Sequence, residues 1–236
     1  MNPAVVVACA LVVLGVMIAV QTAFALVYAV NTMGNIPSAE LGKRVEALAT
    51  NGDVMAVSTI LSSTVCLLLM IAMVKMKRGA ELATYFPLEM PPARRMLPWL
   101  ALAIGMMIAY DAIAIALGKP IVPEFSRQVW ATSSDRMTLV AVIVVAAPVF
   151  EELLFRGFLM RGLLDTRLGE RGAVLVTALL WAFVHLQYDW YGIAYIVLIG
   201  LLFGYARLRT GSLAVPILLH MLVNAVSTLE TALIPP

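Results

Sequence analysis

Long apolar runs constrain this chain more than any other feature of its sequence. They cover roughly residues 3–30, 54–74, 97–117, 137–163, 172–188, 191–206 and 213–231. A helix of about 20 apolar residues is long enough to cross the hydrocarbon core of a bilayer. In that core only helices and closed barrels satisfy their backbone hydrogen bonds, and barrel strands alternate apolar with polar residues, which these runs do not. The sequence therefore predicts an all-α, polytopic transmembrane bundle of about seven to eight helices.

Charged residues are scarce and unevenly placed. They make up 13% of the chain, against about 25% in soluble domains. The net charge of +2 is too small to indicate a nucleic-acid partner. Most Lys and Arg residues instead lie at the ends of apolar runs, where they act as topology signals. The lipid bilayer is thus the expected environment, and nucleic acid is not an expected partner.

A basic, proline-punctuated linker separates the second apolar run from the third. We divide the chain there into residues 1–96, which are N-terminal transmembrane helices and linker, and a core of residues 97–236. The linker holds five of the 16 basic residues, namely Lys75, Lys77, Arg78, Arg94 and Arg95. Such an excess marks a cytoplasmic loop. With seven spans, the N-terminus is then expected in the cytoplasm and the C-terminus outside. The compact chain indicates that the membrane is a prokaryotic plasma membrane.

Three charged residues, Glu151, Glu152 and Arg156, lie close together in the middle of the fourth apolar run, where each costs about 2.5–3.5 kcal/mol. Glu152 and Arg156 are four residues apart, so they share a helix face and can pair. Glu151 is turned about 100° away from that face and is left without a local partner. A structural ion-pair network would explain Glu152 and Arg156 well but would explain Glu151 poorly.

Both histidines of the chain also lie in apolar runs. His185 is in the fifth run, His220 is in the seventh, and Asn224 follows His220 by one helical turn. Lipid offers no hydrogen bonds, so these polar groups must find partners inside the bundle. We expect Glu151, His185, His220 and Asn224 to converge on one cavity, with Glu152 and Arg156 bracing it.

The residue types in this set indicate hydrolysis. A carboxylate beside an imidazole can orient and deprotonate a water molecule. A second imidazole and an amide can donate hydrogen bonds to the oxyanion that forms when the water attacks a carbonyl. The alternative is a catalytic zinc site, for which Glu151, His185 and His220 supply enough ligands. The common helical zinc-peptidase spacing, H-E-x-x-H, is absent from the sequence.

Three motifs resemble a known family. They are E-E-x-x-x-R at Glu151–Arg156, an aromatic-x-x-x-H element at Trp181–His185 and H-x-x-x-N at His220–Asn224. Over residues 137–226 the chain resembles the type II CAAX prenyl endopeptidases, also called the Abi or CPBP family of intramembrane peptidases. Trp181 stands where the family often has Phe and retains an aromatic wall.

The resemblance implies cleavage near the C-terminus of a prenylated or other membrane-associated protein or peptide substrate. It implies that Glu151 and His185 activate the water, and that His220 and Asn224 hold the oxyanion. Glu152 and Arg156 support them, and Trp181 lines the site. We favour a metal-free, glutamate-based mechanism without a cofactor over the zinc alternative. The core of residues 97–236 is then the catalytic part of the chain.

Two other functions fit some of these residues. A non-catalytic membrane scaffold or immunity protein could keep the same fold, and a proton-coupled transporter could use buried Glu and His as a relay. Outside the motifs, Asp111 is a lone acid in the third run, and Tyr188 fits an interfacial aromatic belt. Gly200 and Gly204 are typical of close helix packing.

Overall fold

The computed structural model describes residues 3–33, 38–77 and 79–234, and Arg78 of the basic linker lies outside that part. Every regular element in it is helical, as the apolar runs predict. The helices are α1 (Pro3–Met33), α2 (Ser38–Leu48), α3 (Gly52–Met76), α4 (Leu82–Tyr85), α5 (Ala93–Ala116), α6 (Glu124–Thr132), α7 (Arg136–Ala141), α8 (Ala147–Glu152), α9 (Met160–Leu164), α10 (Gly169–Phe183), α11 (Trp190–Thr210) and α12 (Ala214–Leu233). Two π-helical stretches, η1 (Val142–Ala146) and η2 (Leu153–Leu159), join α7, α8 and α9.

Six helical segments of the described chain are long and apolar enough to cross a membrane. They are Ala4–Thr32, Gly52–Met76, Ala93–Ala116, Arg136–Leu164, Trp190–Thr210 and Ala214–Leu233. The protein is therefore a multi-pass integral membrane protein. The expected fifth span at 172–188 is instead the 15-residue helix α10, which is about 22 Å long. It begins earlier than the apolar run and ends at Phe183, before His185.

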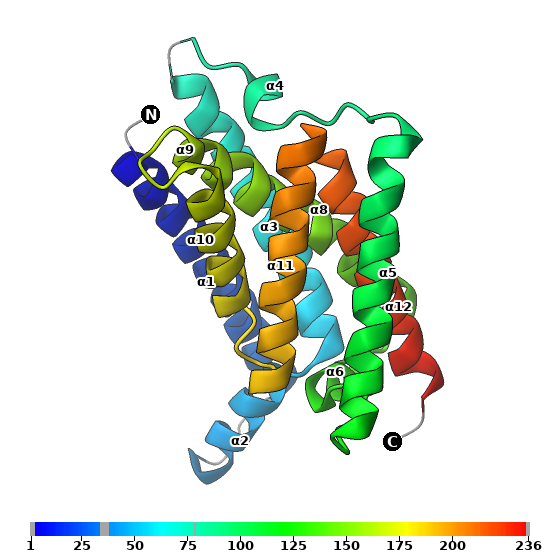
Figure 1. Ribbon diagram of the computed structural model, residues 1–236. Coiled ribbons are helices and arrows are strands. Elements are labelled where there is room, and N and C mark those ends of the chain that lie inside the picture. The colour runs from blue at the N-terminus through cyan, green and yellow to red at the C-terminus, as the bar shows by residue number, and fades with distance from the viewer. Residues whose placement is uncertain (1–2, 34–37, 78, 235–236) are drawn as a thin grey trace.

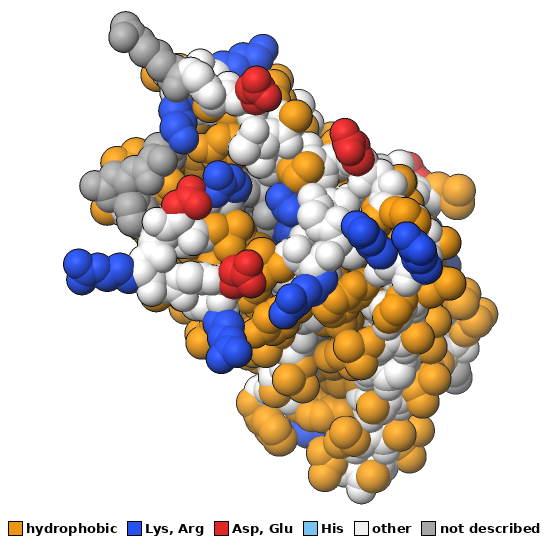
Figure 2. Space-filling view, turned by 45° about the horizontal axis from the view of Figure 1, so that its top comes forward, with side chains coloured by type: hydrophobic (Ala, Val, Ile, Leu, Met, Phe, Trp, Pro, Cys, Tyr) orange, Lys and Arg blue, Asp and Glu red, His pale blue; other side chains and the backbone are white. Residues whose placement is uncertain are grey.

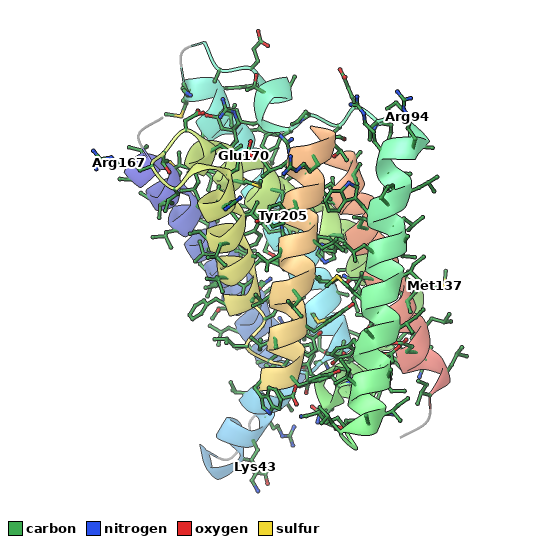
Figure 3. The ribbon with its side chains drawn as sticks, viewed as in Figure 1. Lys43, Arg94, Met137, Arg167, Glu170 and Tyr205 are labelled. Atoms are coloured by element: carbon green, nitrogen blue, oxygen red, sulfur yellow. The ribbon has the colours of Figure 1, made fainter. Side chains whose placement is uncertain are left out.

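The two ends of the bundle differ in charge. The N-terminus and the linker with α4 lie at one end, whereas the C-terminus, α2 and α6 lie at the other (Figure 1). Figure 2, in which the first end is turned towards the viewer, shows Lys and Arg side chains gathered around a hollow. In Figure 3, Arg94 and Arg167 are at this end and Lys43 is at the opposite one. That the basic end faces the cytoplasm stays a prediction.

The fourth span, Arg136–Leu164, is one continuous helix. It contains two wide turns, which are the π-helical stretches η1 and η2. In its first wide turn the N–H of Ala147 donates to the carbonyl of Val142, five residues back. The next residue is Pro148, which has no N–H to offer. The carbonyl of Ile143 is therefore left without a backbone donor from its own helix. Wide turns of this kind often occur at functional sites.

The second wide turn sits in the centre of the core. All seven residues of η2 are buried, and Phe155 and Phe158 belong to the main apolar cluster. Helices α10 and α11 pack closely beside it, as the small residues of α11 predict. A Cβ on Gly204 would lie 2.8 Å from Val174, and one on Gly200 would lie 3.0 Å from Trp181. This close packing brings Trp181 against the fourth span.

Candidate active site

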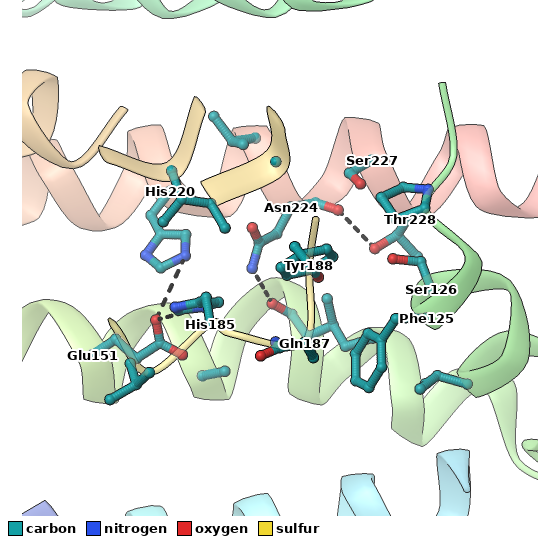
Figure 4. A pocket seen from close by; sticks show the side chains of 18 of the residues that line it. Phe125, Ser126, Glu151, His185, Gln187, Tyr188, His220, Asn224, Ser227 and Thr228 are labelled. Carbon is teal, nitrogen blue, oxygen red and sulfur yellow. Dashed lines mark hydrogen bonds and ion pairs between the residues drawn. The ribbon is translucent and has the colours of Figure 1, made fainter. Parts of the chain in front are cut away.

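Glu151 and both histidines converge at the middle of the bundle (Figure 4). The Oε2 atom of Glu151 lies 3.9 Å from Nε2 of His185 and 4.0 Å from Nε2 of His220. Sequence limits alone place Glu151 and His185 at depths that differ by about 10 Å. In the structure the two side chains nevertheless lie 3.9 Å apart. His185 lies in the turn that follows the helix.

Glu152 is a buried link between Arg156 and His220. Its Oε1 atom is 2.9 Å from Nη1 of Arg156 and 3.0 Å from Nδ1 of His220. Nη2 of Arg156 donates to the carbonyl of Gly200 on α11 at 3.0 Å. The expected pair of Glu152 with Arg156 is present, and Glu152 also orients His220, a contact that no sequence spacing indicated.

Trp181 contacts Glu151, Arg156 and both histidines. Its indole N–H donates to Oε2 of Glu151 at 2.6 Å. The guanidinium of Arg156 lies 4.7 Å from the indole ring centre. The rings of His185 and His220 each meet the indole edge-on, with centroids 5.1 Å away. The sequence indicated only an aromatic wall here, but Trp in place of Phe also adds the one N–H that holds Glu151.

The hydrogen bonds at Nδ1 fix how both imidazoles face the site. Nδ1 of His185 lies 2.8 Å from the carbonyl of Trp181, and a carbonyl can only accept. Nδ1 of His220 faces the carboxylate of Glu152, which also only accepts while it is paired with Arg156. Each ring therefore carries its proton on Nδ1. The two Nε2 atoms are left to face Glu151, where they can accept or, once protonated, donate.

Asn224 caps the wide turn of the fourth span. Its Nδ2 donates to the carbonyl of Ile143 at 2.9 Å, the carbonyl that Pro148 leaves without a helical donor. One N–H of the side-chain amide remains for another acceptor. Asn224 shares a face of α12 with His220, and both line the same cavity. The structure thus places Asn224 in the same cavity as Glu151 and His220, and its part in the chemistry stays a prediction.

One cavity of about 380 Å³ is lined by Glu151, Trp181, His185, His220 and Asn224. Tyr188, which fits an aromatic belt by sequence, instead lies in its wall, with its ring stacked 6.3 Å from that of His185. Asp111 also lines the cavity, and its carboxyl group hydrogen-bonds with that of Glu230 on α12. No sequence pattern indicated this last pair, because it joins two helices far apart in the chain.

The spacing of the nitrogen and oxygen atoms fits a water better than a zinc ion. Tetrahedral ligands about 2.1 Å from zinc lie about 3.4 Å from one another. The distances from Glu151 to the two histidines are 3.9 and 4.0 Å. In the described part of the chain, no three His, Cys, Asp or Glu residues are arranged to hold a metal ion. The mechanism proposed below is therefore the metal-free one.

Comparison with known proteins agrees with the three motifs. An uncharacterized 24.3 kDa protein of Escherichia coli is 33% identical over 129 residues, which cover 52% of this chain and 59% of that protein. The chain thus spans less than two thirds of this relative. No solved structure matches the chain. Residues 133–226, which hold Glu151, His185, His220 and Asn224, match the family model of the Rce1-like type II CAAX prenyl endopeptidases, which confirms the resemblance carried by the motifs.

Proposed function

We propose that this protein is an intramembrane endopeptidase that hydrolyses a peptide bond in a membrane-associated substrate of the prenylated, CAAX type. The family match supports a CAAX-type protease-like function in general. The single observation that carries the finer proposal is the position of Glu151. Its carboxylate faces the Nε2 atoms of two histidines at 3.9 and 4.0 Å inside a cavity.

In the proposed reaction, one water molecule occupies the gap between Glu151 and the histidines. A separation of about 4 Å is wide for a direct hydrogen bond and suits a bridging water. Glu151 accepts a proton from this water while Nε2 of His185 helps to orient it. The hydroxide attacks the scissile carbonyl, and the carbonyl oxygen becomes an oxyanion. Glu151 then passes the proton to the leaving amine when the C–N bond breaks.

His220 and Asn224 are proposed to stabilise the oxyanion. For His220 to donate from Nε2, its ring must be protonated at both nitrogens. The carboxylate of Glu152 accepts from Nδ1 at 3.0 Å and so orients the ring for this role. Arg156 holds the same carboxylate from the other side. The free N–H of Asn224 supplies the second donor, and losing one such donor typically costs about 10²–10³ in kcat.

The sharpest test replaces Glu151 with Gln, which keeps the size and one acceptor but removes the base. The matched control is Glu230→Gln, which alters another acid on the same cavity. Both variants are reconstituted in liposomes with a panel of prenylated and unprenylated membrane peptides, and cleavage is followed by mass spectrometry. We expect Glu151→Gln to lower kcat by about 10²- to 10⁴-fold. Glu230→Gln should leave kcat unchanged.

Other results would point to the rival functions. Equal turnover in Glu151→Gln and wild type would show that Glu151 is not the general base. Proton-coupled flux in the same liposomes, abolished by Glu151→Gln without any peptide cleavage, would support a transporter. Loss of cleavage on dialysis against a chelator, with recovery on adding Zn²⁺, would replace the metal-free mechanism by the zinc alternative with Glu151, His185 and His220 as ligands.

A further inference from the structure

Three cations meet at the basic end of the bundle, away from the cavity that holds Glu151. Lys77 directly follows α3, Arg161 is on α9, and Arg207 is in the last turn of α11. Arg161 is close enough to repel both of the others. We call these three residues the cation cluster. Figure 2 shows Lys and Arg side chains within and around the hollow of this face.

The positive charge of the cluster is only partly compensated. Arg161 pairs with the exposed Asp165, at 2.8 Å. Lys77 donates to the hydroxyl of Tyr85, a neutral acceptor, at 3.3 Å. Nε of Arg207 is buried and has no hydrogen-bond partner among the residues that the structure describes. Arg207 as a whole is half-buried, and together with Lys77 it leaves excess positive charge that an anion from outside the chain can offset.

A second cavity offers the space for that anion. It has a volume of about 220 Å³ and is lined by Lys77, Arg161 and the buried Tyr85. The acids on its wall, Glu81 and Asp165, are exposed, whereas Lys77 and Arg161 are half-buried. The cations of the lining are therefore less exposed to solvent than the acids, which favours an anion over a cation inside.

We propose that this cavity binds a phosphate group, held by Lys77 and Arg161 and attracted by the charge of Arg207. Phosphate suits Lys and Arg donors, because its oxygens accept several charge-assisted hydrogen bonds at once. The site lies at the ends of three spans, which is the level of lipid headgroups. Basic pockets between helices at that level bind anionic headgroups. A phospholipid is therefore the favoured source, and inorganic phosphate is the other.

The test measures the melting temperature of the full chain in a mild detergent. Three additives are compared at equal ionic strength: phosphatidylglycerol, inorganic phosphate, and cholesterol hemisuccinate as an anionic amphiphile without phosphate. We expect phosphatidylglycerol to raise the melting temperature of the wild type by about 3–6 °C. Lys77→Gln with Arg161→Gln should lose most of this rise. The matched control, Arg94→Gln with Arg167→Gln, removes two exposed charges from the same end and should keep it.

Arg207→Met separates ligand binding from simple loss of structure. Without lipid, this variant should melt at or above the wild-type temperature, because it removes a half-buried charge whose Nε atom has no hydrogen-bond partner in the described part of the chain. With phosphatidylglycerol the order should reverse. A lower melting temperature in both conditions would mean that Arg207 is only structural, and would overturn its part in the site.

The additives decide the remaining outcomes. Equal stabilisation by cholesterol hemisuccinate, or an equal loss in the Arg94 and Arg167 control, would reduce the effect to general electrostatics and overturn the proposal. Stabilisation by inorganic phosphate alone would support the phosphate site and overturn the lipid source. None of these results depends on peptidase activity, so the two proposals can fail separately.

Discussion

Trp181 and Glu151 are joined by a 2.6 Å hydrogen bond from the indole N–H to the carboxylate. The bond links α10 to the fourth span at the point where Glu151 faces both histidines. It uses one lone pair of Oε2 and sets the direction in which the rest of the carboxylate points. The ring of the same tryptophan covers the guanidinium of Arg156. Trp181 therefore orients Glu151 and covers the ion pair behind it.

Replacing Trp181 with Phe should separate these two roles. The ring contacts with Arg156 and His220 remain, but the hydrogen bond to Glu151 is lost. Hydrogen bonds to charged groups contribute about 1.5–3 kcal/mol, so we expect kcat to fall by about 10- to 100-fold with little change in KM. Steady-state kinetics in liposomes provide the measurement. Trp190→Phe, at an exposed ring at the start of α11, is the control, and an equal loss there would refute the assignment.

Glu152 and Glu151 should differ sharply in their effect on stability. Glu152→Gln removes the charge that pairs with both Arg156 and His220 in a fully buried setting. Breaking such a pair costs about 3–5 kcal/mol. Glu151→Gln changes a group that lines a cavity and should cost little. Thermal unfolding in detergent should place Glu152→Gln at least about 6 °C below the wild type and Glu151→Gln within about 2 °C of it. Similar values for both would contradict the bracing role of Glu152.

The bond from Asn224 to Ile143 can be tested with Pro148. In the wild type, Asn224→Leu should leave the Ile143 carbonyl unpaired, at a cost of about 1–3 kcal/mol. Pro148→Ala restores an N–H that can serve the freed carbonyls of this turn. The cost of Asn224→Leu should therefore be smaller in the Pro148→Ala background, by about 1 kcal/mol in a double-mutant cycle of unfolding free energies. Strict additivity would show that the two residues do not share a carbonyl.

Asp189 should make stability depend on pH. It caps α11 by accepting from the N–H of Gly192 and also pairs with Lys119. The hydrogen bond from Lys119, followed by that from Gly192, holds the pKa of Asp189 below its ordinary value. A lowered carboxyl pKa stabilises the fold above about pH 4, and this contribution is lost as the pH falls through the folded-state pKa.

Asp189→Asn keeps the cap and removes the ion pair, so it isolates this effect. Because the pair is partly exposed, we expect a melting temperature only about 1–3 °C below the wild type at pH 7. The difference should shrink below about pH 4. Asp189→Ala also removes the cap, so it should lower the melting temperature further at both pH values. A difference between Asn and wild type that stays constant with pH would exclude Asp189 as its source.

The sequence predicted those site residues whose side chains cost free energy to place inside a membrane span. Glu151, Glu152 and Arg156 stand out because charges in an apolar run are expensive, and His185, His220 and Asn224 stand out because lipid cannot satisfy them. The same reasoning could not place the contacts between helices. The link from Glu152 to His220, the bond from Trp181 to Glu151 and the pair of Asp111 with Glu230 depend on how helices rotate against one another. Hydropathy alone does not set that rotation.

Helix limits were the other point where hydropathy failed. The apolar run at 172–188 continues past the end of α10, because the turn with His185 and Tyr188 is also largely apolar. Its side chains stack against the cavity instead of extending a helix. The wide turns η1 and η2 were likewise not indicated, although Pro148 marks the place where the first one frees a carbonyl.

The early end of α10 has a consequence for how the protein sits among lipids. A helix of about 22 Å does not match a hydrocarbon core of about 30 Å. The membrane beside it must thin, or the turn that follows must be screened from acyl chains by neighbouring helices. Thinning of the membrane there brings the aqueous phase nearer to His185 from the end of the bundle that carries the C-terminus. Under the proposed hydrolytic function, the short helix would thus let water approach His185 without a pore through the protein.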